Sequence, residues 1–238
     1  MTNVVIVQAR MTSTRLPGKV LEEVAGRTVL WHVLTRCAAI PGIDIVCCAV
    51  PEGPEQEPVA REAEACGATV ARGSEHDVLD RYYTAARDLG ADIIMRVTSD
   101  CPLIDPGLCG EVLSAVVGDV SVDYAANNFV HRYPHGLDCE AFTWTAMERD
   151  WKEAREPYDR EHVTPWLRRA PEISRVSLEG PSEDLGKLRW TLDYPEDLEF
   201  CRALFPLLGD GIPSWTETLK VCEENKHLQE LNAMRLQR

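Results

Sequence analysis

The sequence predicts an α/β fold of three layers, in which a mostly parallel, Rossmann-like sheet lies between two layers of helices. Short apolar runs alternate with longer amphipathic segments over residues 1–120, a pattern typical of β–α–β units with right-handed crossovers. One apolar run, residues 43–50 (IDIVCCAV), is continuous, as expected for a strand buried on both faces. The chain has 238 residues, of which 45% are hydrophobic, and this length is enough for one large α/β domain.

Four strands and the helices between them account for the first half of the chain. The expected strands are residues 4–8, 43–50, 68–72 and 92–97. The expected helices are residues 28–40, 55–66 and 75–89, with a fourth from about residue 106. In the first helix, Val29, Val33 and Cys37 recur at helical spacing, and Ser74 is in position to cap the third.

From residue 122 the alternation loosens, and residues 124–175 read as an inserted hairpin-and-helix region. The later expected helices are residues 143–155, 160–169, 196–208 and 215–236. The later expected strands are residues 173–178 and 187–192. No internal repeat, low-complexity tract or long linker divides the chain, so we expect a single domain over residues 1–238 that contains this insertion.

Composition and charge exclude several classes of protein. The net charge is −14, which argues against a nucleic-acid binder, because such proteins carry a basic footprint. The first residues lack the features of a signal peptide, and no apolar run is long enough to cross a membrane. None of the nine cysteines forms a C-x-x-C pair, so we expect reduced structural thiols, a cytoplasmic protein and no zinc.

The loop after the first strand, QARMTSTRLPGK, has the composition of a polyphosphate site. Residues 1–21 carry three cations, Arg10, Arg15 and Lys19, and no acid. Small and turn-forming residues between the cations allow close backbone approach, as a phosphate cradle requires. The loop lacks the Walker pattern and the G-x-G-x-x-G pattern of dinucleotide sites. The alternative is a basic loop that only faces solvent.

Two aspartates are candidates for a magnesium site opposite this loop. Asp100 falls just past the fourth strand, and Asp193 follows the strand-like run at residues 187–192. In a parallel sheet the carboxyl ends of the strands share one edge, where ligands bind. Mg²⁺ takes one or two carboxylates together with substrate phosphates. Alternatively, Asp100 is a turn residue and Asp193 is the N-cap of the following helix.

Four segments in this order resemble a known enzyme family over nearly the whole chain: QARMTSTRLPGKVL, RGSEHDVLDRYY, RVTSDCPLIDP and RWTLDYPEDLEF. They resemble the cytidylyltransferases that make CMP-activated acidic sugars, the CMP-acylneuraminate and CMP-ketodeoxyoctonate synthetases. The resemblance is strongest to the branch linked to spore-coat polysaccharide synthesis. It implies a sheet of the nucleotide-diphosphosugar transferase type and a homodimer formed through the inserted region.

The resemblance also implies roles for individual residues. Arg10, Arg15 and Lys19 would be the catalytic cations that bind and polarise the phosphates of CTP, and Asp100 and Asp193 would ligate Mg²⁺. The implied nucleotide-binding set is Ala9, Arg10, Arg15, Lys19, Arg72, Gly73, Ser74, Asp77, Arg81 and Ser99. The implied reaction is attack of an acceptor oxygen on the α-phosphorus of CTP with release of pyrophosphate.

The acceptor is where the sequence departs from the family. The basic and glutamine-containing acceptor motifs of the sialic-acid enzymes have no counterpart that we can place. The candidates in their stead are Asn127, His135, Asp138, Glu140 and His162. His135 could be only a loop histidine, and His162 could make only a structural hydrogen bond. The acceptor is a small acid such as a carboxylated sugar or a phosphonate, or another sugar or polyol.

Two other functions fit parts of the pattern. Metal-dependent glycosyltransferases share the sheet and a metal carboxylate, but they usually carry Asp-x-Asp after a middle strand. Here the corresponding stretch is Ser99-Asp100-Cys101, with one aspartate. A non-catalytic nucleotide-binding domain would have disrupted phosphate or metal positions, and the sequence has none disrupted.

Overall fold

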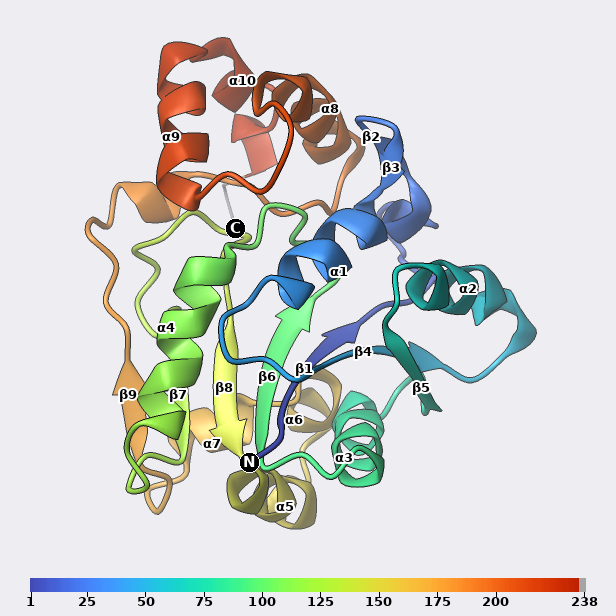
Figure 1. Ribbon diagram of the computed structural model, residues 1–238, viewed down its shortest axis with the longest axis vertical. Coiled ribbons are helices and arrows are strands. Elements are labelled where there is room, and N and C mark those ends of the chain that lie inside the picture. Colours follow the sequence, from blue (N-terminus) through green and yellow to red (C-terminus); the bar gives the residue numbers. More distant parts are fainter. Residues whose placement is uncertain (236–238) are drawn as a thin grey trace.

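A seven-stranded sheet forms the centre of the computed structural model, which describes residues 1–235 (Figure 1). Its order is β5 (Thr69–Gly73), β4 (Ile45–Pro51), β1 (Asn3–Gln8), β6 (Ile93–Thr98), β8 (Glu140–Thr143), β7 (Tyr124–Ala126) and β9 (Arg175–Ser177). The four strands from β5 to β6 are parallel, as the sequence predicted. β8 pairs antiparallel with both β6 and β7, and β9 runs parallel to β7. The hairpin predicted in residues 124–175 is therefore β7 and β8, and it extends this sheet.

Helices cover both faces of the sheet, so the three-layer prediction is confirmed (Figure 1). One face packs against α1 (Val29–Ala38), α2 (Glu57–Ala65) and α4 (Pro106–Val117). The other packs against α3 (Val78–Asp88), α5 (Trp144–Glu153) and α7 (Pro165–Arg169). Successive residues of β1 alternate between the two cores and are fully buried. Each such side chain contributes about 1.5–3 kcal/mol to folding, which fixes the register of the central strands.

A third apolar core lies beyond the carboxyl ends of the parallel strands. It is covered by α8 (Pro195–Leu204), α9 (Trp215–Glu224) and α10 (His227–Glu230), at the top of Figure 1. Trp190 and Leu192 are buried in it, which explains why residues 187–192 have the alternation of a strand. The prediction of a strand there is wrong, because this segment makes only one β-bridge in residues 1–235, between His135 and Arg189.

Three helix boundaries differ from the prediction. The helix expected over residues 160–169 is split into α6 (Pro157–His162) and α7, since Pro165 cannot donate a helical hydrogen bond and begins a new helix. Asp77, rather than Ser74, caps α3 by accepting a hydrogen bond from the backbone of Asp80 (2.9 Å). The helix expected over residues 215–236 is interrupted after α9, and residue 236 lies outside the described residues.

Elsewhere the structure departs little from these expectations. A small two-stranded sheet, β2 (Glu23–Val24) and β3 (Arg27–Thr28), follows the first loop. Among the described residues, none of the helices combines the length and apolar character needed to span a bilayer.

A buried carboxylate on α5 makes the stability of the fold depend on pH. Asp150 is fully buried, and within the described residues neither of its carboxylate oxygens accepts a hydrogen bond. Burial and the nearby Asp159 raise the pKa of Asp150 to about 8. Because the folded protein holds this proton more tightly than the unfolded chain, stability is lost as the pH rises from the ordinary value of 3.8 to about 8.

We therefore expect Asp150→Asn to raise the free energy of unfolding at pH 8 by about 1–3 kcal/mol. Urea unfolding measured from pH 5 to pH 8 checks this, because the natural protein should lose stability over that range more steeply than the variant. Parallel pH profiles for the two proteins would contradict the assignment.

Candidate active site

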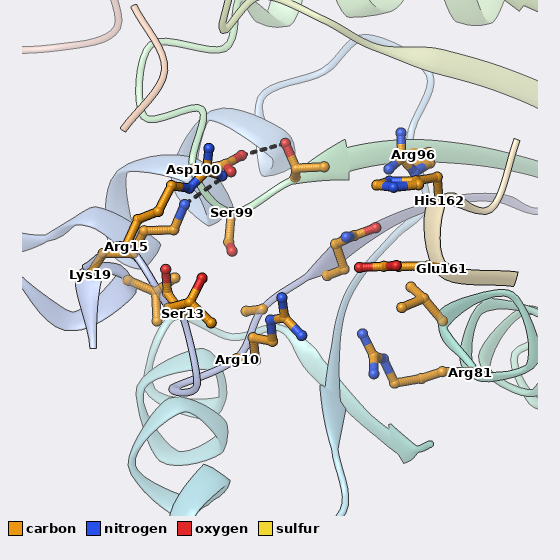
Figure 2. Close-up of a pocket in the computed structure, with 16 residues that line it drawn as sticks. Arg10, Ser13, Arg15, Lys19, Arg81, Arg96, Ser99, Asp100, Glu161 and His162 are labelled. Carbon is orange, nitrogen blue, oxygen red and sulfur yellow. Dashed lines mark hydrogen bonds and ion pairs between the residues drawn. The ribbon is translucent and has the colours of Figure 1, made fainter. Parts of the chain in front are cut away.

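The candidate active site lies where the strand order of the parallel sheet reverses. From β1 the chain passes through α1 to β4 on one side, whereas β6 lies on the other side of β1. Open parallel sheets bind ligands at such a point, beyond the carboxyl ends of the strands. A cavity of about 300 Å³ is found there, lined by the loops after β1 and β6 and by parts of α3 and α6 (Figure 2).

The basic loop after β1 is held in a fixed shape. Gly18 adopts a φ of 71°, a left-handed conformation that favours glycine, and its N–H donates to the carbonyl of Met11 (3.0 Å). The N–H of Met11 in turn donates to the side chain of Gln56 (2.9 Å). This turn directs the following residue, Lys19, into the cavity.

Lys19 joins the two aspartates that the sequence singled out. Its Nζ donates to Asp100 Oδ2 (3.0 Å), Asp193 Oδ1 (3.0 Å) and the carbonyl of Leu192 (2.8 Å). Burial alone would lower the pKa of Lys19, but the two carboxylates outweigh burial and raise it. Burial likewise works against ionisation of Asp100, yet Lys19 and the Thr98 hydroxyl bring its pKa down to about 2. The Lys19 ammonium and the Asp100 carboxylate are therefore charged at neutral pH.

The position of Asp193 is fixed by two arginines and by another aspartate, Asp197. Arg15 donates to Asp193 Oδ1 (2.7 Å), and Arg189 donates to Asp193 Oδ2 (3.2 Å). Arg189 is itself held by Asp197 (2.8 Å), which also accepts from the backbone N–H of Asp193 (2.9 Å). Asn232 completes the arrangement by donating to the carbonyl of Arg189 and to Asp197, both at 3.0 Å. Asp193 is thus not the N-cap of α8, a position that Tyr194 occupies.

The carboxylates have the chemistry of a magnesium site. Asp100 and Asp193 each place one oxygen 3.0 Å from the same ammonium, so the two side chains converge on one cation. Both offer hard oxygen ligands, which Mg²⁺ prefers, and the adjoining cavity has room for the phosphates that complete such sites. The donor set therefore fits the expected cation.

The opposite end of the cavity is lined by Arg96, Glu161 and His162, with Arg81 beside them (Figure 2). Burial lowers the pKa of His162, so its ring is neutral at pH 7. Buried polar atoms without a partner in residues 1–235 include Oε1 of Gln8 and Nε of both Arg81 and Arg96. Leaving a buried polar group unpaired costs free energy.

Sequence reasoning missed several of these residues. They are Arg96, Thr98 and Glu161 in the cavity, and Arg189 and Asp197 behind Asp193. Two of them carried a usable signal. Arg96 is the one charged residue of β6, and Arg189 stands between apolar residues in KLRWTL. A charge inside a buried run is expensive unless it is paired.

The predicted nucleotide-binding residues fall into two groups. Ala9, Arg10, Arg81 and Ser99 line the cavity together with Arg15 and Lys19. Ser74 and Asp77 line an adjoining hollow that shares Arg10 with the cavity.

The residues at the end of β5 lie beside these. A Cβ on Gly73 would lie 3.0 Å from Cγ of Arg81, so glycine allows the two segments to approach closely. Arg72 points elsewhere and pairs with Glu57 (2.7 Å).

The predicted acceptor residues are also divided. His162 lines the cavity, and His135 pairs with Asp138 (3.2 Å) on the loop between β7 and β8. The side-chain amide of Asn127 is hydrogen-bonded to that loop: it donates to the carbonyl of Leu137 (2.7 Å) and accepts from the N–H of Cys139 (3.0 Å).

Glu140 is buried among donors from four elements or loops. It accepts hydrogen bonds from Arg96 (2.7 Å), Thr164 (2.9 Å), Arg168 (3.1 Å) and the hydroxyl of Tyr124. The Glu140 carboxylate therefore holds Arg96 in the cavity wall.

Comparisons with known proteins show the family of the chain. A family model described as cytidylyltransferase matches residues 4–228. The spore coat polysaccharide biosynthesis protein SpsF of Bacillus subtilis is 31% identical over 212 residues, covering 86% of this chain and 87% of that protein. A 3-deoxy-manno-octulosonate cytidylyltransferase of Geobacter metallireducens is 36% identical over 119 residues, covering 49% of this chain and 45% of that enzyme.

Solved structures give the same result. A cytidylyltransferase from Leptospira borgpetersenii superposes with a TM-score of 0.92 at 28% identity, covering 96% of this chain and 97% of that one. A CMP-2-keto-3-deoxy-manno-octonic acid synthetase, solved in complex with CTP, has the same fold with a TM-score of 0.67 at 20% identity, covering 87% and 99%. The chain therefore belongs to the cytidylyltransferase family, and it is a nucleotidyltransferase.

Proposed function

We propose that this enzyme transfers CMP from CTP to a small acidic acceptor, such as a carboxylated sugar or a related acid, with release of pyrophosphate. The observation that carries the proposal is the convergence of Arg15 and Lys19 with Asp100 and Asp193 at one end of the cavity. The names of the relatives support the acidic acceptor, because one of them acts on a keto sugar acid and another serves polysaccharide synthesis.

The cations of the first loop would bind and neutralise the triphosphate. In the reaction, an acceptor oxygen forms a bond to the α-phosphorus while the bond from that phosphorus to the bridging oxygen breaks. Negative charge then grows on the departing pyrophosphate. Positioning and charge neutralisation supply most of the catalysis in such displacements. Arg10, Arg15 and Lys19, which all line the cavity, are the side chains that would stabilise this charge.

Asp100 and Asp193 would hold Mg²⁺, which when bound neutralises phosphate oxygens and orients them for displacement. Lys19 now bridges the two carboxylates, so its ammonium would turn toward the phosphates when the cation is held. Arg189 and Asp197 keep the Asp193 carboxylate in place through that exchange.

The acceptor would occupy the cavity near His162, and His135 with Asp138 would border it. Ala9, Arg81 and Ser99 are the proposed contacts of the nucleoside, with Ser74 and Asp77 in the adjoining hollow. Asn127 and Glu140 would act indirectly, because both are bonded within the protein. Homodimer formation through residues 124–175 stays a prediction.

Pyrophosphate release tests the proposal directly. With Mg²⁺ and a panel of carboxylated sugars and phosphonates, CTP should support release and the other nucleoside triphosphates should not. We expect Asp100→Asn to lower turnover roughly 100-fold or more while the protein stays folded. Asp184→Asn is the matched control, because Asp184 lies on the surface and pairs with exposed Lys187.

Two results would overturn this proposal. Unchanged turnover in Asp100→Asn would remove this carboxylate from the mechanism. Turnover of a nucleotide sugar, without pyrophosphate release from CTP, would instead indicate a glycosyltransferase.

A further inference from the structure

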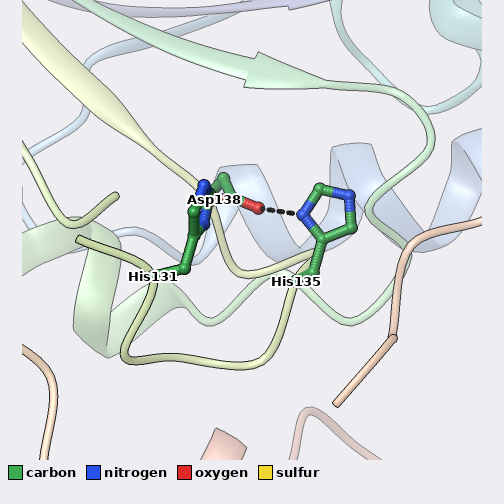
Figure 3. A group of neighbouring side chains, drawn as sticks. All are labelled: His131, His135 and Asp138. Carbon is green, nitrogen blue, oxygen red and sulfur yellow. Dashed lines mark ion pairs between the residues drawn. The ribbon is translucent and has the colours of Figure 1, made fainter. Parts of the chain in front are cut away.

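Two histidines and an aspartate form a separate cluster on the loop that joins β7 to β8. His131 Nδ1 lies 3.7 Å from one oxygen of Asp138, and His135 Nδ1 lies 3.2 Å from the other. One ligand atom from each of the three side chains lies within 4.8 Å of the other two. Figure 3 shows the Asp138 carboxylate between the two imidazole rings.

Two of the three residues are held in place by backbone hydrogen bonds, His135 through its own backbone and Asp138 through its carboxylate. The N–H of His135 donates to the carbonyl of Leu188 (2.9 Å), and its own carbonyl accepts from the N–H of Trp190 (2.7 Å). The next residue, Gly136, has a φ of 115°, and a Cβ there would lie 2.6 Å from the backbone of Trp190. The N–H of Gly136 donates to Asp138 (3.0 Å), which orients that carboxylate. The loop is therefore pinned at His135 and Asp138.

His131 supplies the adjustable part of the cluster. Its side chain is 60% exposed, so its ring can turn toward the other two without disturbing the core. A tetrahedral centre with bonds of about 2.0–2.1 Å places its ligand atoms roughly 3.3 Å apart. His135 Nδ1 already lies 3.2 Å from Asp138 Oδ2, and His131 Nδ1 lies 3.7 Å from Asp138 Oδ1. With one ligand atom taken from each residue, all three atoms lie within 4.8 Å of one another, so a turn of the His131 ring would close the set around one cation.

We propose that His131, His135 and Asp138 bind a divalent transition-metal cation of the zinc class. Two imidazole nitrogens and one carboxylate oxygen suit zinc and its neighbours, whereas Mg²⁺ prefers oxygen ligands alone. Three protein ligands leave at least one coordination position for water or an anionic group. This site is distinct from the pair Asp100 and Asp193, shares no ligand with it, and does not depend on the proposed reaction.

The cysteine pattern led us to expect no zinc, and this cluster uses none of the cysteines. Its sequence signal is the spacing H-x-x-x-H-x-x-D in HRYPHGLD. That spacing brings the side chains together only because the loop turns at Gly136 and is fastened to residues 188–190.

Binding of Zn²⁺ and Co²⁺ to the tag-free protein, freed of metal with a chelator, tests this site. We expect one equivalent of Zn²⁺ by calorimetry in the presence of excess Mg²⁺, and a visible absorption band when Co²⁺ is added. His131→Ala and His135→Ala should each weaken Zn²⁺ binding by more than the roughly 10–100-fold that loss of an outer-shell partner costs. His131→Ala removes an exposed side chain, so its folding is not at risk.

Three controls decide between this site and others. His227→Ala, which removes another exposed histidine, and Cys66→Ser, which removes the one cysteine of residues 1–235 that is not buried, should bind as the natural protein does. Asp100→Asn should also bind Zn²⁺ normally. The proposal is overturned if the natural protein takes up no stoichiometric Zn²⁺, if both histidine variants bind unchanged, or if Asp100→Asn or excess Mg²⁺ abolishes binding.

Discussion

Replacing Lys19 by alanine is expected to lower kcat/KM for CTP roughly 10²–10³-fold, the loss typical when one preorganised group that stabilises transition-state charge is removed. The same substitution should also lower the stability of the metal-free protein. Lys19 is the cation shared by Asp100 and Asp193, and its side chain is 10% exposed. Asp193 keeps Arg15 and Arg189, but within residues 1–235 the Asp100 side chain keeps only the Thr98 hydroxyl and the neighbouring Cys101 thiol. We expect a loss of up to about 3 kcal/mol in the free energy of unfolding.

The effect of Mg²⁺ should show whether stability is lost because Asp100 and Asp193 lack a cation or because the fold as a whole is disturbed. If Asp100 and Asp193 hold a divalent cation, Mg²⁺ should restore much of the lost stability in Lys19→Ala and stabilise the natural protein less. Thermal unfolding with and without Mg²⁺ measures this difference, and steady-state pyrophosphate release measures kcat/KM. Lys187→Ala is the matched control, because that lysine pairs with an aspartate at the surface. Wild-type turnover in Lys19→Ala would exclude Lys19 from the mechanism.

Glu140→Gln is expected to lower the free energy of unfolding by about 3–5 kcal/mol, because neutralising one partner of a buried ion pair leaves the other uncompensated. Two arginines, Arg96 and Arg168, share this carboxylate, and the Glu140 side chain is 2% exposed. Burial alone would raise the pKa of Glu140, but the two guanidinium groups lower it. The stabilisation is therefore present at neutral pH and is lost as the pH falls through this lowered pKa.

The activity of Glu140→Gln separates a positioning role from contact with the acceptor. In the variant Arg96 loses its charged partner and is no longer held in the cavity wall. The KM for the acceptor should therefore rise, measured at a low temperature at which the protein is still folded. Urea unfolding gives the stability, and Glu179→Gln is the control, because Glu179 is exposed and pairs with Arg132 at the surface. An unchanged free energy of unfolding with a large loss of activity would favour direct contact with the acceptor.

The fold and the grouping of Lys19 with Asp100 and Asp193 were largely accessible from sequence. The apolar runs located β1 and β4, because central strands buried on both faces are mostly apolar. Shorter runs located β6, which carries Arg96, and the edge strand β5. The rule that ligands bind at the carboxyl ends of parallel strands then placed Lys19 and Asp100 on the same edge of the sheet.

What the sequence could not supply was the pairing of distant charges. Arg96 meets Glu140 across 44 positions only because β6 and β8 pair in one register. The alternation at residues 187–192 reports burial of Trp190 and Leu192, but it does not reveal that helices, rather than strands, bury them. Local pattern fixes which side chains are inside, whereas their partners depend on tertiary packing.

The residues of the proposed phosphate site lie far apart in the sequence. This separation determines when the site can form during translation. Lys19 and Asp193 are 174 positions apart, and Asn232, which steadies Arg189 and Asp197, comes later still. During translation the basic loop and β1 leave the ribosome long before the carboxylate that they face. The emerging protein can build its parallel sheet early, but it cannot complete a nucleotide site until Asp193 and its supports have been synthesised. If CTP binds at this site as proposed, a nascent chain would not capture it before the region around Asn232 has folded against Arg189 and Asp197.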